Sequence, residues 1–222
     1  MSMQTTEEKF IEYHNERFEK FGDSPMTFWG SKESQEKRFE ALVKLFNRKS
    51  NFTVIDIGCG TGGFLDYLVY KGYGDFRYFG FDINQKYIDI ANEKFGKVLI
   101  WINSPDSKNK TGHSFGCGGF EDVKKIISEI RDVDYAVASG IYCFGSYQTS
   151  IRNNYFYDFN EIFPLLNEGY ACNFLSQYSD TRNPDVIYHD PQEIFKIAMC
   201  HSKKVSLHHD YLPNDFTVIV RK

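Results

Sequence analysis

The sequence predicts an α/β fold, a three-layer sandwich in which a seven-stranded, mostly parallel sheet lies between helices, with the last strand antiparallel. Short runs rich in β-branched and aromatic residues alternate with segments of helical period, which indicates parallel strands joined by right-handed crossovers. The tail instead carries two strand-like runs separated by Leu212–Asp215, a gap that suits a hairpin and therefore a reversed last strand. Nothing within the 222 residues has the composition of a linker, so we expect one domain over residues 1–222.

Two further helices are predicted before the sheet. Apolar and aromatic residues recur at helical spacing over residues 10–21, and a stretch rich in Gly, Pro and Ser follows over residues 22–30. Residues 1–33 are therefore expected to form a helix and a lid-like loop. A second amphipathic helix should begin at Ser34, a suitable N-cap, and open the core domain of residues 34–222.

The core elements follow in alternation. One irregular stretch, Ser104–Phe120, is expected to form a mobile loop beside the site. The predicted strands are residues 52–57, 77–82, 97–102, 133–139, 170–176, 204–211 and 216–220. The predicted helices contain residues 64–68, 87–91, 123–130, 156–166 and 191–199.

Composition excludes several classes of function. The chain has 26 Lys and Arg against 30 Asp and Glu, a formal net charge of -4, and no long run of either sign, so nucleic acid is not an expected partner. The five cysteines are widely spaced and include no C-x-x-C pair, which argues against a zinc site and favours a reducing, cytoplasmic location. No segment has the pattern of a signal peptide or the length of an apolar membrane span.

The strongest motif is VIDIGCGTGG, residues 54–63, in which a buried strand runs into alternating glycines and then into a helix. Glycine permits the backbone angles of a tight strand-to-helix turn and lets a ligand approach the main chain closely. A cofactor should therefore lie at this loop, beyond the carboxyl ends of the strands.

This loop, with Asp56 two residues before Gly58, resembles motif I of the class I, Rossmann-like S-adenosylmethionine-dependent methyltransferases. The resemblance covers about residues 34–222. It implies that Asp56 interacts with the methionine ammonium of the cofactor, and that Asp82, at the end of the second strand, accepts hydrogen bonds from the ribose hydroxyls. Asn103, or failing it Asp106, falls where the family contacts adenine.

Two residues at the start of the second helix extend this set. Trp29 is expected to close over the cofactor, and Arg38 either pairs with the cofactor carboxylate or lies on a solvated face. The implied cofactor is S-adenosylmethionine, with S-adenosylhomocysteine as product and no metal. The cofactor-binding candidates are Asp56, Gly58, Cys59, Gly60, Gly62, Asp82, Ile83, Asn103, Ser139, Gly140, Arg38 and Trp29.

Fewer residues are candidates for a direct role in methyl transfer than for cofactor binding. Methyl transfer from a sulfonium needs alignment and exclusion of water, and a general base helps when the acceptor is a hydroxyl or a protonated amine. His189, on the loop after the fifth strand, is the first candidate base, although Asp190 beside it reads as the N-cap of the next helix. Tyr142, directly after the fourth strand, is the candidate for orienting the acceptor, with core packing as the alternative.

We expect methyl transfer to an oxygen or nitrogen of a small polar metabolite, by a monomer or homodimer. The segments at residues 28–39, 188–195 and 209–222 resemble a subgroup of bacterial small-molecule methyltransferases, some associated with surface polysaccharide or capsule assembly, which implies a sugar or a polysaccharide precursor as acceptor. The alternatives are a nucleic-acid or protein methyltransferase, and a protein that binds the cofactor without catalysis. The literal G-x-G-x-x-G at Gly58, Gly60 and Gly63 also leaves open a nicotinamide or flavin domain.

Overall fold

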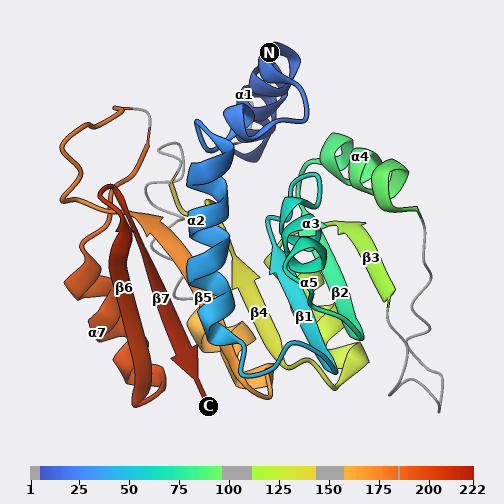
Figure 1. Ribbon diagram of the computed structural model, residues 1–222, viewed down its shortest axis with the longest axis vertical. Helices are drawn as coiled ribbons and strands as arrows, with labels where there is room; N and C mark the ends of the chain where they lie inside the picture. Colours follow the sequence, from blue (N-terminus) through green and yellow to red (C-terminus); the bar gives the residue numbers. More distant parts are fainter. Residues whose placement is uncertain (1–5, 97–111, 144–157, 185) are drawn as a thin grey trace.

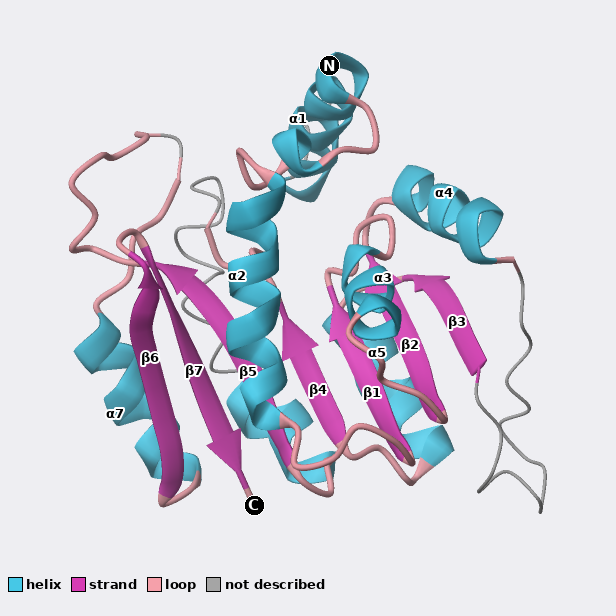
Figure 2. Cartoon of the chain, viewed as in Figure 1, coloured by secondary structure: helices cyan, strands magenta, loops and turns pink. Residues whose placement is uncertain are grey.

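The computed structural model describes residues 6–96, 112–143, 158–184 and 186–222, and these form one seven-stranded sheet with helices on both faces (Figures 1 and 2). The strand order is β3-β2-β1-β4-β5-β7-β6. The first five strands are parallel, whereas β7 runs antiparallel to β5, and β6 runs antiparallel to β7. The predicted fold class, including the reversed last strand, is thereby confirmed. The strands are β1 Phe52–Ile57, β2 Phe76–Asp82, β3 Gly112–Cys117, β4 Tyr135–Ala138, β5 Gly169–Leu175, β6 Lys204–Leu212 and β7 Asp215–Arg221.

The sheet is buried on both faces because alternate residues of each strand enter one of two hydrophobic clusters. Val54 of β1 packs in one cluster with α2 and α3, while Ile55 packs in the other with α5 and α7. The helices are α1 Thr6–Phe21, α2 Lys32–Leu42, α3 Gly63–Tyr70, α4 Gln85–Phe95, α5 Phe120–Ile130 and α7 Pro191–His201, with shorter turns at Pro25–Thr27, Val43–Leu45, Asp158–Ile162 and Phe163–Leu165.

The strand beside β2 differs from the prediction. It is β3, Gly112–Cys117, which pairs with β2 from Arg77↔Gly112 to Asp82↔Cys117 and lies within the stretch expected to be an irregular loop. The predicted third strand, residues 97–102, lies outside the described residues. An edge strand needs few apolar side chains, and Phe115 is the only buried residue of β3. The Gly and Ser residues of this segment have low strand propensity, so the sequence did not predict a strand here.

Two helix predictions are also corrected. The second helix begins after Ser31, whose Oγ accepts a hydrogen bond from the Ser34 amide at 3.0 Å, so Ser31 rather than Ser34 is the N-cap. The described part of the predicted helix 156–166 is a π turn followed by a 3-10 turn, because Pro164 has no amide hydrogen to continue an α-helix. Asp190 caps α7 as predicted, accepting from the Gln192 amide at 2.8 Å.

The elements together place the candidate site. The parallel strands end on one edge of the sheet, and α1 with the following loop lies above this edge (Figure 1). Among the described residues, no helix combines the length and apolar character required to cross a bilayer.

Candidate functional site

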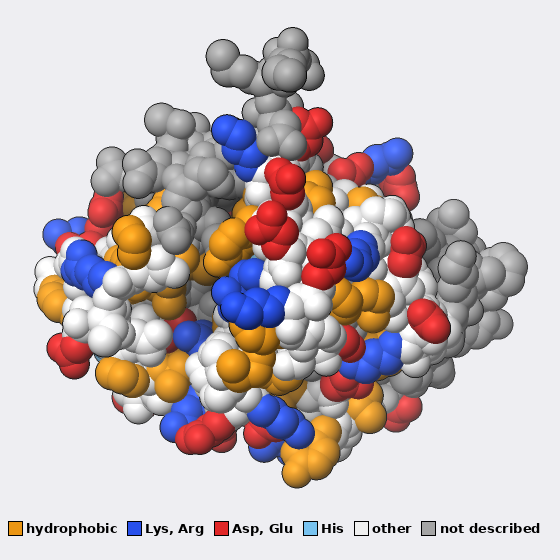
Figure 3. Space-filling view, turned by 90° about the horizontal axis from the view of Figure 1, so that it is seen from above, with side chains coloured by type: hydrophobic (Ala, Val, Ile, Leu, Met, Phe, Trp, Pro, Cys, Tyr) orange, Lys and Arg blue, Asp and Glu red, His pale blue; other side chains and the backbone are white. Residues whose placement is uncertain are grey.

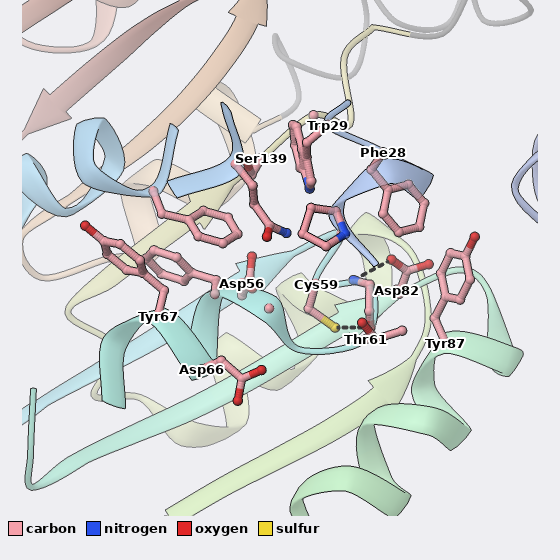
Figure 4. Close-up of a pocket in the computed structure, with 18 of the residues that line it drawn as sticks. Phe28, Trp29, Asp56, Cys59, Thr61, Asp66, Tyr67, Asp82, Tyr87 and Ser139 are labelled. Atoms are coloured by element: carbon pink, nitrogen blue, oxygen red, sulfur yellow. Dashed lines mark hydrogen bonds between the residues drawn. The ribbon is translucent and has the colours of Figure 1, made fainter. Parts of the chain in front are cut away.

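A cavity of about 690 Å³ lies where β1, β2 and β4 end. Its floor is the glycine loop, its far wall is the segment after β4, and its roof comes from α1 and the loop that follows it. Figure 4 shows Asp56 and Asp82 on either side of Cys59, with Trp29 and Phe28 above them. A cavity of this size accommodates a cofactor together with a small second molecule.

The glycine loop takes its shape from residues without side chains. Gly58, Gly60 and Gly62 have φ angles of 75°, 53° and 84°, a region that other residues rarely adopt. A Cβ atom on Gly58 would lie 2.1 Å from Cγ2 of Ile141. The loop is also tied to β2, since the amides of Gly58 and Cys59 donate to the Phe81 carbonyl at 2.7 and 2.9 Å. Close packing therefore holds a bare stretch of main chain at the cavity floor.

Asp56 lies beneath this loop, at the end of β1 on the face of the sheet covered by α2 and α3. Its side chain is buried and its Oδ2 accepts a hydrogen bond from the Tyr78 hydroxyl at 2.5 Å. Burial raises the pKa of Asp56 to about 7, while the Tyr78 hydrogen bond acts in the opposite direction. A cationic group placed in the cavity would restore the ionised form of this carboxyl.

Asp82 ends β2 and reaches the cavity from the other side of the loop. Its Oδ2 accepts from the Gly60 amide at 3.0 Å and its Oδ1 from the Asn84 amide at 2.9 Å. Burial raises the pKa of Asp82 to about 6, against the effect of these two hydrogen bonds. The helix after β2 is capped by Asn84, whose Oδ1 accepts from the Lys86 amide at 3.1 Å, so Asp82 is not its N-cap.

The roof contains cavity residues that the sequence did not reveal. The Tyr87 hydroxyl donates to the His14 carbonyl at 2.8 Å, and the Thr61 hydroxyl donates to Asp23 at 2.6 Å, so α1 and its loop are bonded to α4 and the glycine loop. His14 also lines the cavity, and burial lowers its pKa to about 4, with Arg17 adding to the shift. The sequence alone, by contrast, already offers His14, on the first helix, as a residue that could contact substrate on lid closure.

The segment after β4 forms the opposite wall. Ser139 and Gly140, which the sequence predicts to bind the cofactor, both line the cavity. They are fixed by Asn173 of β5, whose Oδ1 accepts from the Gly140 amide at 2.9 Å and whose Nδ2 donates to Ser139 Oγ at 3.0 Å. Trp29 lines the same wall and lies directly against Gly140.

Arg38 occupies neither of its expected places. Its side chain is buried, so it is not on a solvated face, and it is not among the residues that line the cavity. Its Nε donates to Asp215 Oδ2 at 2.8 Å, and its Nη1 donates to the carbonyl of Ser34 at 3.0 Å. The sequence could not reveal this partner, which lies 177 positions away.

The two candidates for the chemistry lie behind the cavity wall rather than on it. The Tyr142 hydroxyl donates to Asp158 and lies 2.7 Å from the Tyr170 hydroxyl, in a fully buried cluster. The Nε2 of His189 lies 2.8 Å from the Tyr142 carbonyl, which can only accept, so this nitrogen carries the proton. Burial raises the pKa of Asp158 well above its usual range.

The remaining candidates divide into two groups. Gly62 and Ile83 adjoin the cavity without lining it, and a Cβ on Gly62 would lie 2.5 Å from the Phe95 ring. Asn103 and Asp106 lie outside the described residues. In the part of the chain that the structure describes, no cluster of three or more His, Cys, Asp or Glu side chains is arranged to hold a metal ion.

Comparison with known proteins agrees with this architecture. The family model described as "Methyltransferase domain" matches residues 14–164, which contain the glycine loop, Asp56 and Asp82. A Mycobacterium tuberculosis protein named methyltransferase Rv1506c is 29% identical over 187 residues, covering 81% of this chain and 99% of the relative.

Solved structures show the same fold at low identity. The cyclopropane synthase MmaA2 from Mycobacterium tuberculosis has a TM-score of 0.64 at 10% identity, covering 95% of this chain and 80% of that chain. The plantazolicin methyltransferase BamL, in complex with a triazolic desmethylPZN analogue and S-adenosylhomocysteine, has a TM-score of 0.57 at 15% identity, covering 97% of this chain and 91% of that chain. The chain belongs to the methyltransferase domain family and has its class I, Rossmann-like fold.

Proposed function

We propose that the protein transfers a methyl group from S-adenosylmethionine to a small acceptor. The observation that carries this proposal is the placement of two carboxyl groups, Asp56 and Asp82, on either side of a bare glycine loop. Asp56 suits an ammonium group, because a fixed positive charge would stabilise the carboxylate that burial now disfavours. Asp82 suits a ribose diol, since a carboxylate accepts hydrogen bonds from two hydroxyl groups.

The bound cofactor would supply an activated methyl group on a sulfonium, and the residues of this chain would align it. Gly60, where a Cβ would meet nothing within 4 Å, leaves room for the ligand above the main chain, while Asp56 and Asp82 would hold its two ends. The roof formed by α1 keeps water from the reacting atoms, as methyl transfer requires. Holding both reactants in line is the main contribution of the protein.

His189 and Tyr142 enter this proposal as residues that position the wall after β4. The His189 ring holds the Tyr142 carbonyl, and the Tyr142 hydroxyl is anchored on Asp158. The neighbours of Tyr142 in sequence, Ile141 and Cys143, line the cavity. Both residues therefore act on the acceptor site through the main chain between Ile141 and Cys143.

The acceptor in this proposal is a small polar molecule methylated on oxygen or nitrogen, such as a sugar or a polysaccharide precursor. Among the described residues that line the cavity, two are lysines, and each lies near a carboxylate: Lys32 lies 3.7 Å from Glu36, and Lys94 pairs with Asp66. The charge of these two side chains is thus balanced within the protein, which favours an uncharged acceptor over a phosphorylated one.

The surface gives no support to a nucleic-acid acceptor. Seen from above, acidic and basic side chains are interspersed on the visible part of the cavity end, without a broad basic area (Figure 3). No disulfide joins the five cysteines, all of which are described, in keeping with the proposal of a cytoplasmic protein. A monomer or a homodimer is consistent with this proposal.

The test has two stages. Calorimetric titration with S-adenosylmethionine, S-adenosylhomocysteine and NAD should show micromolar binding of the first two and none of the third. Transfer of an isotopically labelled methyl group should then be screened against sugars, nucleotide-linked sugars and amines. Binding of NAD alone would reject the proposal, and tight cofactor binding without transfer to any acceptor would leave a binding protein.

A further inference from the structure

The side chain of Trp29 is held at the cavity wall from two sides. Its indole ring lies over the guanidinium of Arg38, whose central carbon is 5.0 Å from the ring centroid. The ring also reaches Gly140, where a Cβ atom would lie 2.4 Å from Cη2 of the indole. Because Gly140 has no side chain, the indole can rest directly on the main chain after β4. Figure 4 shows Trp29 projecting toward the cavity beside Ser139.

The guanidinium beneath the indole is itself fixed in orientation. Arg38 bonds to Asp215 at 2.8 Å through Nε, and through Nη1 to the carbonyl and hydroxyl oxygens of Ser34 at 3.0 and 2.5 Å. These bonds engage two different edges of the planar group and so determine its plane. The side chains of Arg38 and Asp215 are only 5% and 3% exposed, so solvent does not compete for either partner.

Asp215 is fixed in turn by the C-terminal hairpin. Its Oδ1 accepts a hydrogen bond from the Tyr211 hydroxyl, which also lies 2.8 Å from Thr217 Oγ1. A series of contacts therefore runs from β6 and β7 through Arg38 to the indole of Trp29. The series joins three parts of the chain that are distant in sequence.

Trp29 also lies close to the part of the cavity wall that packs against the glycine loop. The residue after Gly140 is Ile141, whose side chain packs on Gly58 of the glycine loop. Trp29, Gly140, Ile141 and Gly58 are thus consecutive neighbours along the cavity wall. Trp29 lines the same cavity as Asp56 and Asp82, so an acceptor that shares the cavity with a cofactor held by these carboxyl groups would meet the indole.

We propose that Trp29 is a specificity-determining residue for the acceptor, and that the buried pair Arg38 and Asp215 positions its indole against Gly140. The inference rests on the proposed function. A buried ion pair alone contributes little net stability, because desolvation of the two charges offsets their attraction. Beyond packing, the Arg38–Asp215 pair holds a planar cation in a fixed orientation under the indole ring of Trp29. The indole then presents the same surface to each acceptor that enters.

The sequence contains two tryptophans, Trp29 and Trp101, so the variant Trp101→Phe makes Trp29 the sole fluorescent indole. In this background we would measure the emission maximum and acrylamide quenching of Trp29 for Asp215→Asn and Arg38→Lys. Lysine keeps the positive charge of Arg38 but lacks its planar guanidinium. We therefore expect both variants to shift the emission maximum of Trp29 to longer wavelength and to raise its acrylamide quenching constant about twofold. If the pair were only a link between α2 and β7, Arg38→Lys would leave the emission unchanged.

The matched control is Glu33→Gln, which removes an exposed ion pair with Lys37 (2.8 Å) on the same helix. It should leave the Trp29 emission as in the parent, and circular dichroism would confirm that every variant is folded. S-adenosylhomocysteine affinity should stay within about threefold in Asp215→Asn, whose side chain does not line the cavity, while the relative rates of Trp29→Phe and Asp215→Asn across the acceptor panel should change about tenfold.

The outcomes separate the two proposals. Failure of the parent to bind S-adenosylhomocysteine would reject the proposed function, whatever the emission of Trp29 shows. Normal binding, with Trp29 emission unchanged in Asp215→Asn and Arg38→Lys, would reject the positioning role. Normal binding with a shifted emission but unchanged acceptor preference would reject Trp29 as a determinant of specificity.

Discussion

The carboxyl group of Asp82 accepts a hydrogen bond from the amide of Gly60 at 3.0 Å, which joins the end of β2 to the glycine loop on the cavity floor. This bond keeps one carboxylate oxygen beside the position that a ribose would occupy. It also makes the shape of the loop depend on the same side chain that would bind the ligand.

Asp82→Ala should therefore weaken the binding of S-adenosylhomocysteine. Loss of the carboxylate would leave two ribose hydroxyls without acceptors and release the Gly60 amide, an effect we expect to be about tenfold or more in the dissociation constant. Calorimetric titration measures it directly. The control is Asp89→Ala, an exposed carboxylate on α4, which should bind as the wild type does. Unchanged affinity in Asp82→Ala would remove this residue from the site.

Cofactor binding should depend on pH. The pKa values of Asp56 and Asp82 are raised to about 7 and about 6, and both carboxyls must be ionised to hold the ligand. Affinity should therefore fall as the pH is lowered from 8 to 5.5, and binding near pH 6.5 should release protons. Titration in two buffers of different ionisation enthalpy would detect that release. A dissociation constant independent of pH over this range would contradict the assignment.

Asp56 should also make the ligand-free protein less stable as the pH rises. Its folded pKa of about 7 lies above the usual value of 3.8, so the folded state binds more protons between these limits and the free energy of unfolding falls through this window. We expect Asp56→Asn, which has no charge to desolvate, to gain a few kcal/mol over the wild type between pH 4 and pH 7. Denaturant unfolding at several pH values measures this difference, and parallel curves for the two proteins would contradict it.

Two glycine substitutions in the loop should differ in their effect on stability. Gly58→Ala would force a methyl group onto Ile141 in addition to the unfavourable φ angle, whereas a Cβ on Gly60 meets nothing within 4 Å. We expect Gly58→Ala to lower the melting temperature by several degrees more than Gly60→Ala, since about 1 kcal/mol corresponds to about 2 to 4 °C at this size. The double variant Gly58→Ala with Ile141→Ala should recover part of the loss. Equal melting temperatures for the two single variants would argue against the steric contact.

Tyr142→Phe should destabilise the fold without changing cofactor affinity. The phenol hydroxyl bonds to Asp158 and Tyr170 in a buried cluster, and its removal should cost about 1 to 3 kcal/mol of unfolding free energy. Denaturant unfolding of Tyr142→Phe should be compared with Tyr178→Phe, whose exposed ring provides the control. Unchanged stability together with a raised KM for the acceptor would instead place Tyr142 at the acceptor.

The glycine loop and the two carboxyl groups that line the cavity were predictable as neighbours, because these residues are adjacent in sequence to strand ends. Asp56 and Asp82 follow from where β1 and β2 stop, and the three glycines follow from the turn that joins β1 to α3. β3 was not predictable, because an edge strand of Gly, His, Ser and Cys around one buried Phe115 depends on its pairing with β2 rather than on its own propensity.

Apart from β3 and the turns at residues 158–165, the sequence by itself determined the alternation of strands and helices, the reversed last strand and the position of the glycine loop, because hydrophobic period and glycine placement are local properties. Only the tertiary structure decided the partners of the polar side chains. Arg38 meets Asp215, and His14 lies over the cavity, because the sheet brings together segments far apart in the chain. Burial then lowers the pKa of His14 and raises the pKa of Asp215, and burial is a property of the packed fold alone.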